Sequence, residues 1–216
     1  MKAVILIPFR PESGTRWREK ELAAVKKHVA PLGLPIHLLD SGTQPFSVAR
    51  SYNLASDLEW DVAILQGADV FAPIENMRQT LETDGMTYAF DSACRLDVEA
   101  TEYYLQYGKV LDDREHVRRW TSLRWAGGPR AVTRTLWDTV QGFDRRFVGW
   151  GGEDKSFAHA CRLLGHVTRL PGELVTLWAP TDQTYKSRWP QNRRVWKEYL
   201  RCQTADEMRA LLMSRR

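Results

Sequence analysis

Short apolar runs and segments with helical spacing alternate through the first 70 residues of the chain. The apolar runs Ala3–Ile7, Ile36–Leu39 and Val62–Leu65 predict buried strands of a parallel sheet. The two segments between them, Glu19–Val29 and Phe46–Leu58, predict helices. This alternation predicts an α/β fold with a Rossmann-like sheet, in which ligands bind at the carboxyl ends of the strands.

The pattern is less regular beyond Asp69, and no element is assigned to Leu96–Trp120. Two helices are predicted for the C-terminal tail, Arg193–Leu212, and Thr204 with Glu207 has the spacing of a capping box that opens the second. The other patterned segments predict helices at Ile74–Leu81, Thr133–Val140 and Glu153–Leu164, and strands at Thr87–Phe90, His166–Leu170 and Leu174–Trp178.

The composition is that of a soluble domain with a full core. Of 216 residues, 43% are hydrophobic and 27% charged, which excludes collagenous, low-complexity and disordered classes. No apolar stretch reaches the roughly 18 residues of a membrane span, so we expect a cytoplasmic protein. The three cysteines have no short spacing, which excludes a zinc knuckle. A net charge of +4 slightly favours an anionic ligand. Nine tryptophans weakly favour a ligand with a ring, such as a sugar or a base.

The densest cluster of chemistry-bearing residues runs from Gly142 to Asp154. It contains Gly149-Trp150-Gly151-Gly152, whose glycines let the backbone approach a ligand closely, followed by Glu153 and Asp154 at the start of a predicted helix. A glycine-rich turn with acidic capping would explain the glycines and the acids. It would not require a tryptophan held between the glycines, so we favour a functional site.

This cluster resembles the Gly-Trp-Gly-Gly-Glu-Asp signature in the C-terminal region of the β-1,4-galactosyltransferases, which are GT-A glycosyltransferases. Three further segments resemble motifs of that family in the same order: Ile7–Arg10 its donor-binding opening, Phe46–Asn53 a helix, and Gly127-Gly128 its paired glycines. The resemblance implies a GT-A fold, with a mixed sheet flanked by helices and a helical C-terminal tail. It also implies one domain over residues 1–216, with a nucleotide-binding half (1–70), an acceptor and catalytic half (120–182) and a tail (190–216).

The resemblance places the nucleotide sugar, first of all a UDP-sugar, at the ends of the first strands. Arg10 would face a phosphate through its fork of donors. Asp40 would accept from the uracil or ribose, and Phe46 would stack on the base. The second basic position of the family's helix is Val48 here. The donor-binding residues implied are Pro8, Phe9, Arg10, Asp40, Phe46, Arg50, Asp69 and Gly128.

A divalent metal, manganese or magnesium, is implied with a weakened site. Asp69 lies where the family has the last acid of an Asp-x-Asp motif that holds the metal on the diphosphate. The first acid is Gly67 here, and the metal-binding histidine expected after Trp178 is Ala179. The site would therefore use Asp69 with Asp182 or with water, or no metal. Without metal, Arg10, Arg50 and the stretch Lys186–Arg194 would neutralise the diphosphate.

The resemblance implies that Asp154 is the general base, since inverting transfer needs a carboxylate that takes the proton of the acceptor hydroxyl. Glu153 would hydrogen-bond an acceptor hydroxyl, Trp150 would give the acceptor ring an apolar platform, and Gly151 would line the same site. Related retaining enzymes also carry a Trp-Gly-Gly-Glu segment, commonly followed by Asn, so Asp154 favours inversion.

The leading hypothesis is a bacterial or phage-type glycosyltransferase acting on a saccharide, a protein or a modified nucleic acid. Gly67 and Ala179 keep open a degenerate module that binds nucleotide sugar or glycan without turnover. Arginines and tryptophans between Arg188 and Trp196 keep open nucleic-acid binding, including transfer to modified DNA bases.

Overall fold

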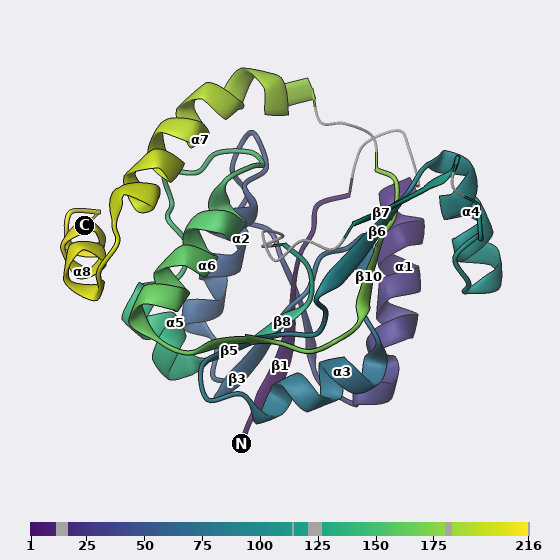
Figure 1. The fold of residues 1–216 in the computed structure, drawn as a ribbon, viewed down its shortest axis with the longest axis horizontal. Coiled ribbons are helices and arrows are strands. Elements are labelled where there is room, and N and C mark those ends of the chain that lie inside the picture. Colours follow the sequence, from purple (N-terminus) through teal and green to yellow (C-terminus); the bar gives the residue numbers. More distant parts are fainter. Residues whose placement is uncertain (12–16, 114, 121–126, 180–182, 216) are drawn as a thin grey trace.

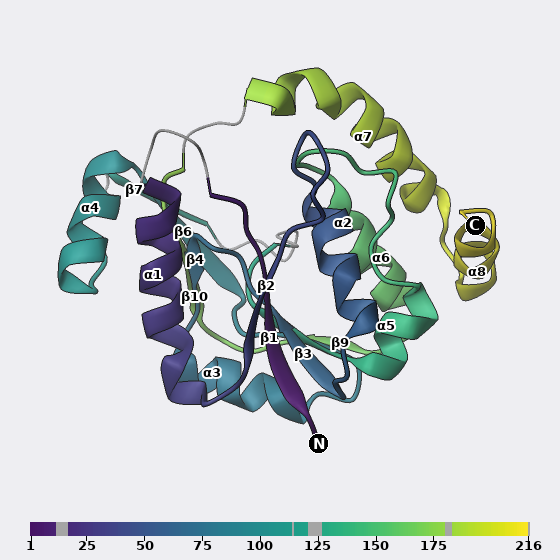
Figure 2. The ribbon, with the colours of Figure 1, turned by 180° about the vertical axis from the view of Figure 1, so that it is seen from behind.

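The computed structural model describes residues 1–11, 17–113, 115–120, 127–179 and 183–215, with the backbone alone described for 183–187. A mixed six-stranded sheet forms its centre (Figure 1, Figure 2). Its order is β2-β1-β3-β8-β5-β9, and β8 runs antiparallel to both of its neighbours. These strands are β1 (Ala3–Pro8), β2 (Ile36–Leu39), β3 (Val62–Leu65), β5 (Met86–Tyr88), β8 (Arg130–Thr133) and β9 (Val167–Arg169).

A second, four-stranded sheet has the order β4-β10-β6-β7. Its strand β10 pairs in parallel with β6 and antiparallel with β4. The chain passes from the first sheet to the second within a few residues, between Leu65 of β3 and Val70 of β4. These strands are β4 (Val70–Phe71), β6 (Ser92–Leu96), β7 (Val117–Trp120) and β10 (Glu173–Thr176).

Helices cover both faces of the central sheet. In both views α1 and α3 lie on one side of it and α2, α5 and α6 on the other (Figure 1, Figure 2). The long helix α7 arches over the end at which β1 finishes, and α8 packs beside α6 (Figure 1). The helices are α1 (Trp17–Val29), α2 (Val48–Tyr52), α3 (Ile74–Gln79), α4 (Val98–Tyr107), α5 (Arg134–Val140), α6 (Glu153–Leu164), α7 (Gln183–Arg201) and α8 (Ala205–Met213).

The α/β architecture predicted from the sequence is confirmed. Two of the predicted strands, Ile36–Leu39 and Val62–Leu65, have the predicted bounds. The side chains of β1 and β3 are apolar and mostly fully buried, because helices cover both faces there. The capping box of α8 is also present, with Thr204 accepting from the Glu207 backbone and Glu207 accepting in return.

Two predicted helices differ most from their expected bounds. The helix expected over Phe46–Leu58 is the short α2 followed by a 3-10 turn at Asn53–Asp57, because Ser47 caps α2 by accepting from the Arg50 backbone. The first helix of the tail begins at Gln183 rather than Arg193 and contains Pro190. A proline in a sequence predicts a helix boundary, and here the helix continues through it.

The unassigned segment Leu96–Trp120 contains a helix and an edge strand. The Asp97 side chain accepts from the Ala100 backbone at the start of α4, and Gly108 ends the helix in the left-handed conformation. Strand β7 follows and pairs antiparallel with β6.

Among the described helices, none is long and apolar enough to span the hydrocarbon core of a membrane.

Candidate active site

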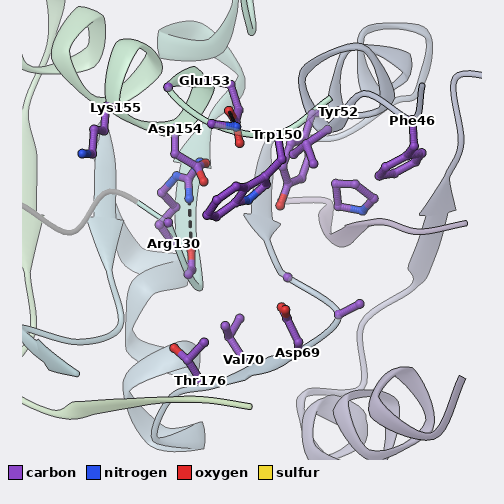
Figure 3. Close-up of a pocket in the computed structure, with 18 of the residues that line it drawn as sticks. Phe46, Tyr52, Asp69, Val70, Arg130, Trp150, Glu153, Asp154, Lys155 and Thr176 are labelled. Carbon is purple, nitrogen blue, oxygen red and sulfur yellow. Dashed lines mark hydrogen bonds and ion pairs between the residues drawn. The ribbon is translucent and has the colours of Figure 1, made fainter. Parts of the chain in front are cut away.

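A pocket of about 490 Å³ lies between the ends of the N-terminal strands and the loop that leads into α6 (Figure 3). In the close-up, Asp69, Val70 and Thr176 lie on one side and Trp150 and Asp154 on the other. The predicted site residues that line this pocket are Pro8, Phe46, Asp69, Gly128, Trp150, Gly151, Glu153 and Asp154.

The glycines of the loop before α6 have the backbone conformation that exposes Trp150. Gly149, Gly151 and Gly152 have φ angles of 71°, 111° and 95°, a region that favours glycine. A Cβ atom on Gly152 would also lie 2.9 Å from the Phe147 ring. The Trp150 side chain is 54% exposed and borders the pocket, so its ring presents an apolar surface to any molecule that enters.

This loop is fixed from both sides. Asn192 of α7 is fully buried; it accepts from the Val148 backbone N–H at 3.2 Å and donates to the Val148 carbonyl at 3.0 Å. Ser47, just before α2, donates to the Phe147 carbonyl at 3.0 Å. The helix α7 is therefore part of the scaffold of the Trp150 loop and not a separate tail.

Asp154 is held by an arginine that the sequence did not single out. Nη2 of Arg130 donates to Oδ1 of Asp154 at 2.6 Å, and Nη1 donates to the Gly128 carbonyl at 3.1 Å. The Arg130 side chain is 1% exposed and that of Asp154 is 26% exposed. The pair therefore joins a buried cation to a carboxylate that solvent and ligands can reach.

The surroundings of Arg130 are aromatic. Its guanidinium carbon lies 5.7 to 5.9 Å from the ring centroids of Tyr88, Phe143 and Phe157, within the range of cation–π attraction. Burial is the largest single effect and lowers the pKa of Arg130, but the charge and hydrogen bond of Asp154, together with the neighbouring tyrosines, outweigh it and the pKa is raised. Arg130 is therefore a permanent charge beneath the carboxylate of Asp154.

Glu153 has a different environment from Asp154. It is buried, and its carboxylate accepts from the Gly151 backbone N–H at 2.6 Å, which closes the turn before α6. Burial raises the pKa of Glu153, and the charge of Asp154 raises it further. The two adjacent acids thus differ in accessibility, and Asp154 is the better placed of the two to take a proton from a ligand.

Four predicted donor residues do not line the pocket described here. Phe9 packs into the core, where its backbone N–H donates to the Leu39 carbonyl. Nε of Arg50 donates to the Arg145 carbonyl at 3.1 Å, which joins α2 to the loop after α5. Arg10 and Asp40 form an ion pair with each other.

The Arg10–Asp40 pair stands next to the pocket wall. Nε of Arg10 donates to Oδ2 of Asp40 at 2.8 Å, and the guanidinium lies over the Phe46 ring, 5.2 Å from its centroid. The hydrogen bond from Arg10 lowers the pKa of Asp40, which keeps this carboxylate ionised. Phe46 itself lines the pocket. The Arg10–Asp40 pair therefore packs against the ring that we expect to stack on the nucleotide base.

Asp69 lies on the wall that faces Trp150 and Asp154, beside a second arginine, Arg18 (Figure 3). Nη1 of Arg18 is 3.4 Å from Oδ2 of Asp69 and 3.1 Å from Oε2 of Glu21. Nε1 of Trp17 donates to Oε1 of Glu21 and to the Trp178 carbonyl, both at 3.1 Å. These bonds tie the start of α1 to the ends of β3 and β10.

The described residues do not fit a resident metal ion. No group of three or more His, Cys, Asp or Glu side chains among them is arranged to hold an ion, and the cation nearest Asp69 is Arg18. Ala179 carries no donor side chain, and the candidate ligand Asp182 lies outside the described residues. The metal at Asp69 therefore stays a prediction that this part of the structure does not support.

Five pocket residues with polar or charged side chains were missed by the sequence analysis. A charged residue inside the apolar strand segment Arg130–Thr133 was a usable signal, because a strand between two others rarely buries an unpaired charge. The other four carried no pattern of their own. The missed residues are Arg18, Tyr52, Arg130, Lys155 and Thr176.

Glu21 gives the fold a testable pH dependence. Its side chain is 0% exposed, and burial raises its pKa to about 7. The folded state then binds more protons than the unfolded state between about pH 4.5 and pH 7, so stability falls as pH rises through that window. We expect Glu21→Gln, which cannot titrate, to reduce this fall by about 2 to 3 kcal/mol. Urea titrations of both proteins at pH 5 and pH 7.5 measure the free energy of unfolding. An equal fall between the two pH values in wild type and in Glu21→Gln would contradict the raised pKa of Glu21.

The chain is similar to GT-A glycosyltransferases in sequence and in fold. A family model described as the N-terminal domain of galactosyltransferase matches residues 113–176. The chain is 27% identical over 182 residues to β-1,4-galactosyltransferase 5 of Sus scrofa, covering 79% of this chain and 40% of that protein. It thus spans about two-fifths of the length of that curated relative.

Solved structures have the same fold. A mutant of Drosophila β-1,4-galactosyltransferase 7 in complex with manganese, UDP-Gal and xylobiose aligns with a TM-score of 0.52 and 18% identity, over 78% of this chain and 64% of that one. A mannosyltransferase of Pyrobaculum calidifontis in complex with GDP-Man and Mn²⁺ aligns with a TM-score of 0.52 and 13% identity, over 99% of this chain and 68% of that one. The predicted GT-A fold and the resemblance to a galactosyltransferase-like domain are confirmed.

Proposed function

We propose that this domain transfers a sugar from a nucleotide sugar, first of all a UDP-sugar, to an acceptor hydroxyl with inversion at the anomeric carbon. The observation that carries this proposal is Asp154, a partly exposed carboxylate in the pocket, held by buried Arg130 and next to the exposed ring of Trp150. The similarity to β-1,4-galactosyltransferases supports the same activity.

The donor occupies the wall formed by the N-terminal half in this proposal. The base stacks on Phe46, and the diphosphate extends toward Asp69 along Pro8. Arg10 and Asp40 hold the ribose side of the nucleotide through the pair that they already form. Gly128 lines the pocket at the sugar end, and the packing there requires glycine, because a Cβ would lie 2.8 Å from the Phe90 ring.

The acceptor lies against Trp150 with its hydroxyl at Asp154. Arg130 holds Oδ1 of Asp154, and Oδ2 is the oxygen we assign to the acceptor proton. As the acceptor oxygen attacks the anomeric carbon, its proton moves to Oδ2. The bond between the anomeric carbon and the diphosphate oxygen breaks, and its electron pair leaves with the diphosphate. One displacement of this kind inverts the configuration.

A saccharide is the acceptor class that the exposed Trp150 ring favours. The xylobiose in the Drosophila complex is a saccharide bound to a structural relative. Arg193 and Arg194 are exposed on α7, so a modified nucleic acid stays among the acceptors to test, as does a protein.

The cytoplasmic and bacterial or phage-type setting stays a prediction. All three cysteines are free and buried, in keeping with a reduced compartment.

The test is turnover with a panel of nucleotide sugars and acceptors. Release of nucleoside diphosphate and a coupled product with inverted anomeric configuration by NMR are expected for one pair. Retained configuration would overturn the inverting assignment. Binding of nucleotide sugar without turnover on any acceptor would support the degenerate binding module, and no binding of any nucleotide sugar would overturn the transferase proposal.

Arg10→Ala is expected to weaken UDP binding by several-fold. The substitution removes the guanidinium that is stacked on Phe46 and bonded to Asp40, so both side chains lose their preset geometry. Calorimetric titration of UDP measures the change. Arg134→Ala is the matched control, because that arginine also packs over an aromatic ring and pairs with an aspartate, on the side of α5. Equal UDP affinity in wild type and Arg10→Ala would remove Arg10 from the donor site.

A further inference from the structure

Arg18 lies on the pocket wall at the carboxylate that the sequence assigned to a metal. It lines the pocket, is partly exposed, and is 3.4 Å from Asp69. The proposed function puts the donor's diphosphate on this wall, and the inference below rests on that function. A guanidinium presents several N–H donors in one plane, which matches the oxygens of a phosphate group.

The position of Arg18 is set by a fully buried acid. Oε2 of Glu21 accepts from Nη1 of Arg18, and Oε1 of Glu21 accepts from the Trp17 ring. The Trp17 ring also bonds to the Trp178 carbonyl and packs edge-on against the Trp178 ring, with centroids 5.6 Å apart. Because both Glu21 oxygens are used, moving Arg18 out of the pocket would leave a buried carboxylate without its cation.

A divalent ion on Asp69 would compete with this arrangement. Bound to Oδ2 at the usual distance of about 2.1 Å, it would lie at most about 5.5 Å from Nη1 of Arg18, and the two cations would repel each other. The described residues offer it no group of three ligating side chains. Arg18 already supplies a positive charge at that place.

We infer that Arg18 binds the donor's diphosphate and neutralises its charge, and that nucleoside diphosphate binding by this protein needs no divalent metal. Asp69 then orients the guanidinium instead of coordinating an ion. As the bond to the anomeric carbon breaks, the charge that develops on the leaving diphosphate is stabilised by Arg18.

Calorimetric titration of UDP and GDP, in EDTA and then with excess Mn²⁺, tests this inference on the full chain. We expect the dissociation constant in EDTA to lie within about threefold of that in Mn²⁺, because the charge at the diphosphate is covalently attached to the chain. Arg18→Gln should weaken binding by at least about tenfold in both conditions. Arg209→Gln, which alters an exposed arginine paired with an acid three residues away, is the matched control and should bind as wild type does.

Asp69→Asn separates the two arrangements by the direction of its effect. If Arg18 carries the charge, the variant keeps or strengthens binding in EDTA, since a negative charge near the diphosphate is removed. If Asp69 is a metal ligand, wild type binds only with Mn²⁺ and the variant loses that binding. The second result, or unchanged affinity in Arg18→Gln, overturns the inference while leaving the proposed function intact. No binding of any nucleoside diphosphate in either condition overturns the proposed function itself.

A folding defect in Arg18→Gln would not block the test. The double variant Arg18→Met with Glu21→Gln removes the cation and the buried charge that it balances, so no unpaired charge stays in the fold. Circular dichroism checks its fold, and the same titrations in EDTA and Mn²⁺ apply. Wild-type UDP affinity in this folded double variant would also overturn the inference.

Discussion

Asp154→Asn is expected to lower turnover by about a hundredfold to ten-thousandfold and to leave UDP affinity nearly unchanged. The reason is that the base acts only while the acceptor proton moves, whereas the donor is held by the opposite wall of the pocket. Asparagine keeps the size of the side chain and an oxygen that can accept from Arg130, but it cannot take up the proton. Initial rates with saturating donor and acceptor, together with calorimetric UDP titration, measure both quantities.

The control for this prediction is Asp206→Asn. Asp206 is an exposed acid in the first turn of α8, paired with Arg209, and its substitution should leave turnover unchanged. Trp150→Ala is expected to differ from Asp154→Asn in kind, because a platform contact exists before the transition state. It should raise the acceptor KM as well as lower turnover. Near-normal turnover in Asp154→Asn on a confirmed acceptor would require another base or a retaining mechanism.

The sequence predicts the parts of the site that are encoded in short segments. The apolar runs of β1 and β3 indicate buried strands, and the strand ends carry Pro8 and Asp69 to the pocket. Glycines around Trp150 indicate a turn that only glycine adopts, and the structure has positive φ angles there. These features depend on neighbours within a few residues, so they can be recognised without the fold.

The features that the sequence did not show depend on residues far apart in the chain. Arg130 precedes Asp154 by 24 residues, and Arg18 precedes Asp69 by 51, so no local pattern joins them. The motif helix and the loop before α6 are joined in the same way, since the Asn53 side chain pairs with the Phe143 backbone. Motif order indicated that these segments act together, and the hydrogen bonds supply the physical reason.

The roles expected from the sequence and the contacts in the structure differ most for the charged side chains. The sequence assigned Arg10 to a phosphate and Asp69 to a metal, whereas in the structure each of these side chains has a protein partner of opposite sign. Arg130 follows the same pattern beneath Asp154. Ion pairs that close before the ligand binds hold charged groups in fixed positions, which reduces the reorganisation that binding and reaction require.

The Arg130–Asp154 pair is expected to be asymmetric in stability. Asp154→Asn leaves the fully buried guanidinium of Arg130 without a counter-charge, and we expect it to lower the free energy of unfolding by about 2 to 4 kcal/mol. Arg130→Met leaves behind a carboxylate that water can reach, and the new side chain fits among apolar rings. We expect this variant to cost less than about 2 kcal/mol.

The double variant Arg130→Met with Asp154→Asn completes the cycle. Because it removes the buried cation together with its partner, it should regain most of the stability that Asp154→Asn alone loses. Urea unfolding of the four proteins at pH 7 measures all three differences, with equal m-values as the check that unfolding stays two-state. If Arg130→Met destabilised the fold more than Asp154→Asn did, the packing of Arg130 against the Tyr88, Phe143 and Phe157 rings would outweigh its charge. Ring packing, and not the ion pair with Asp154, would then account for the burial of Arg130.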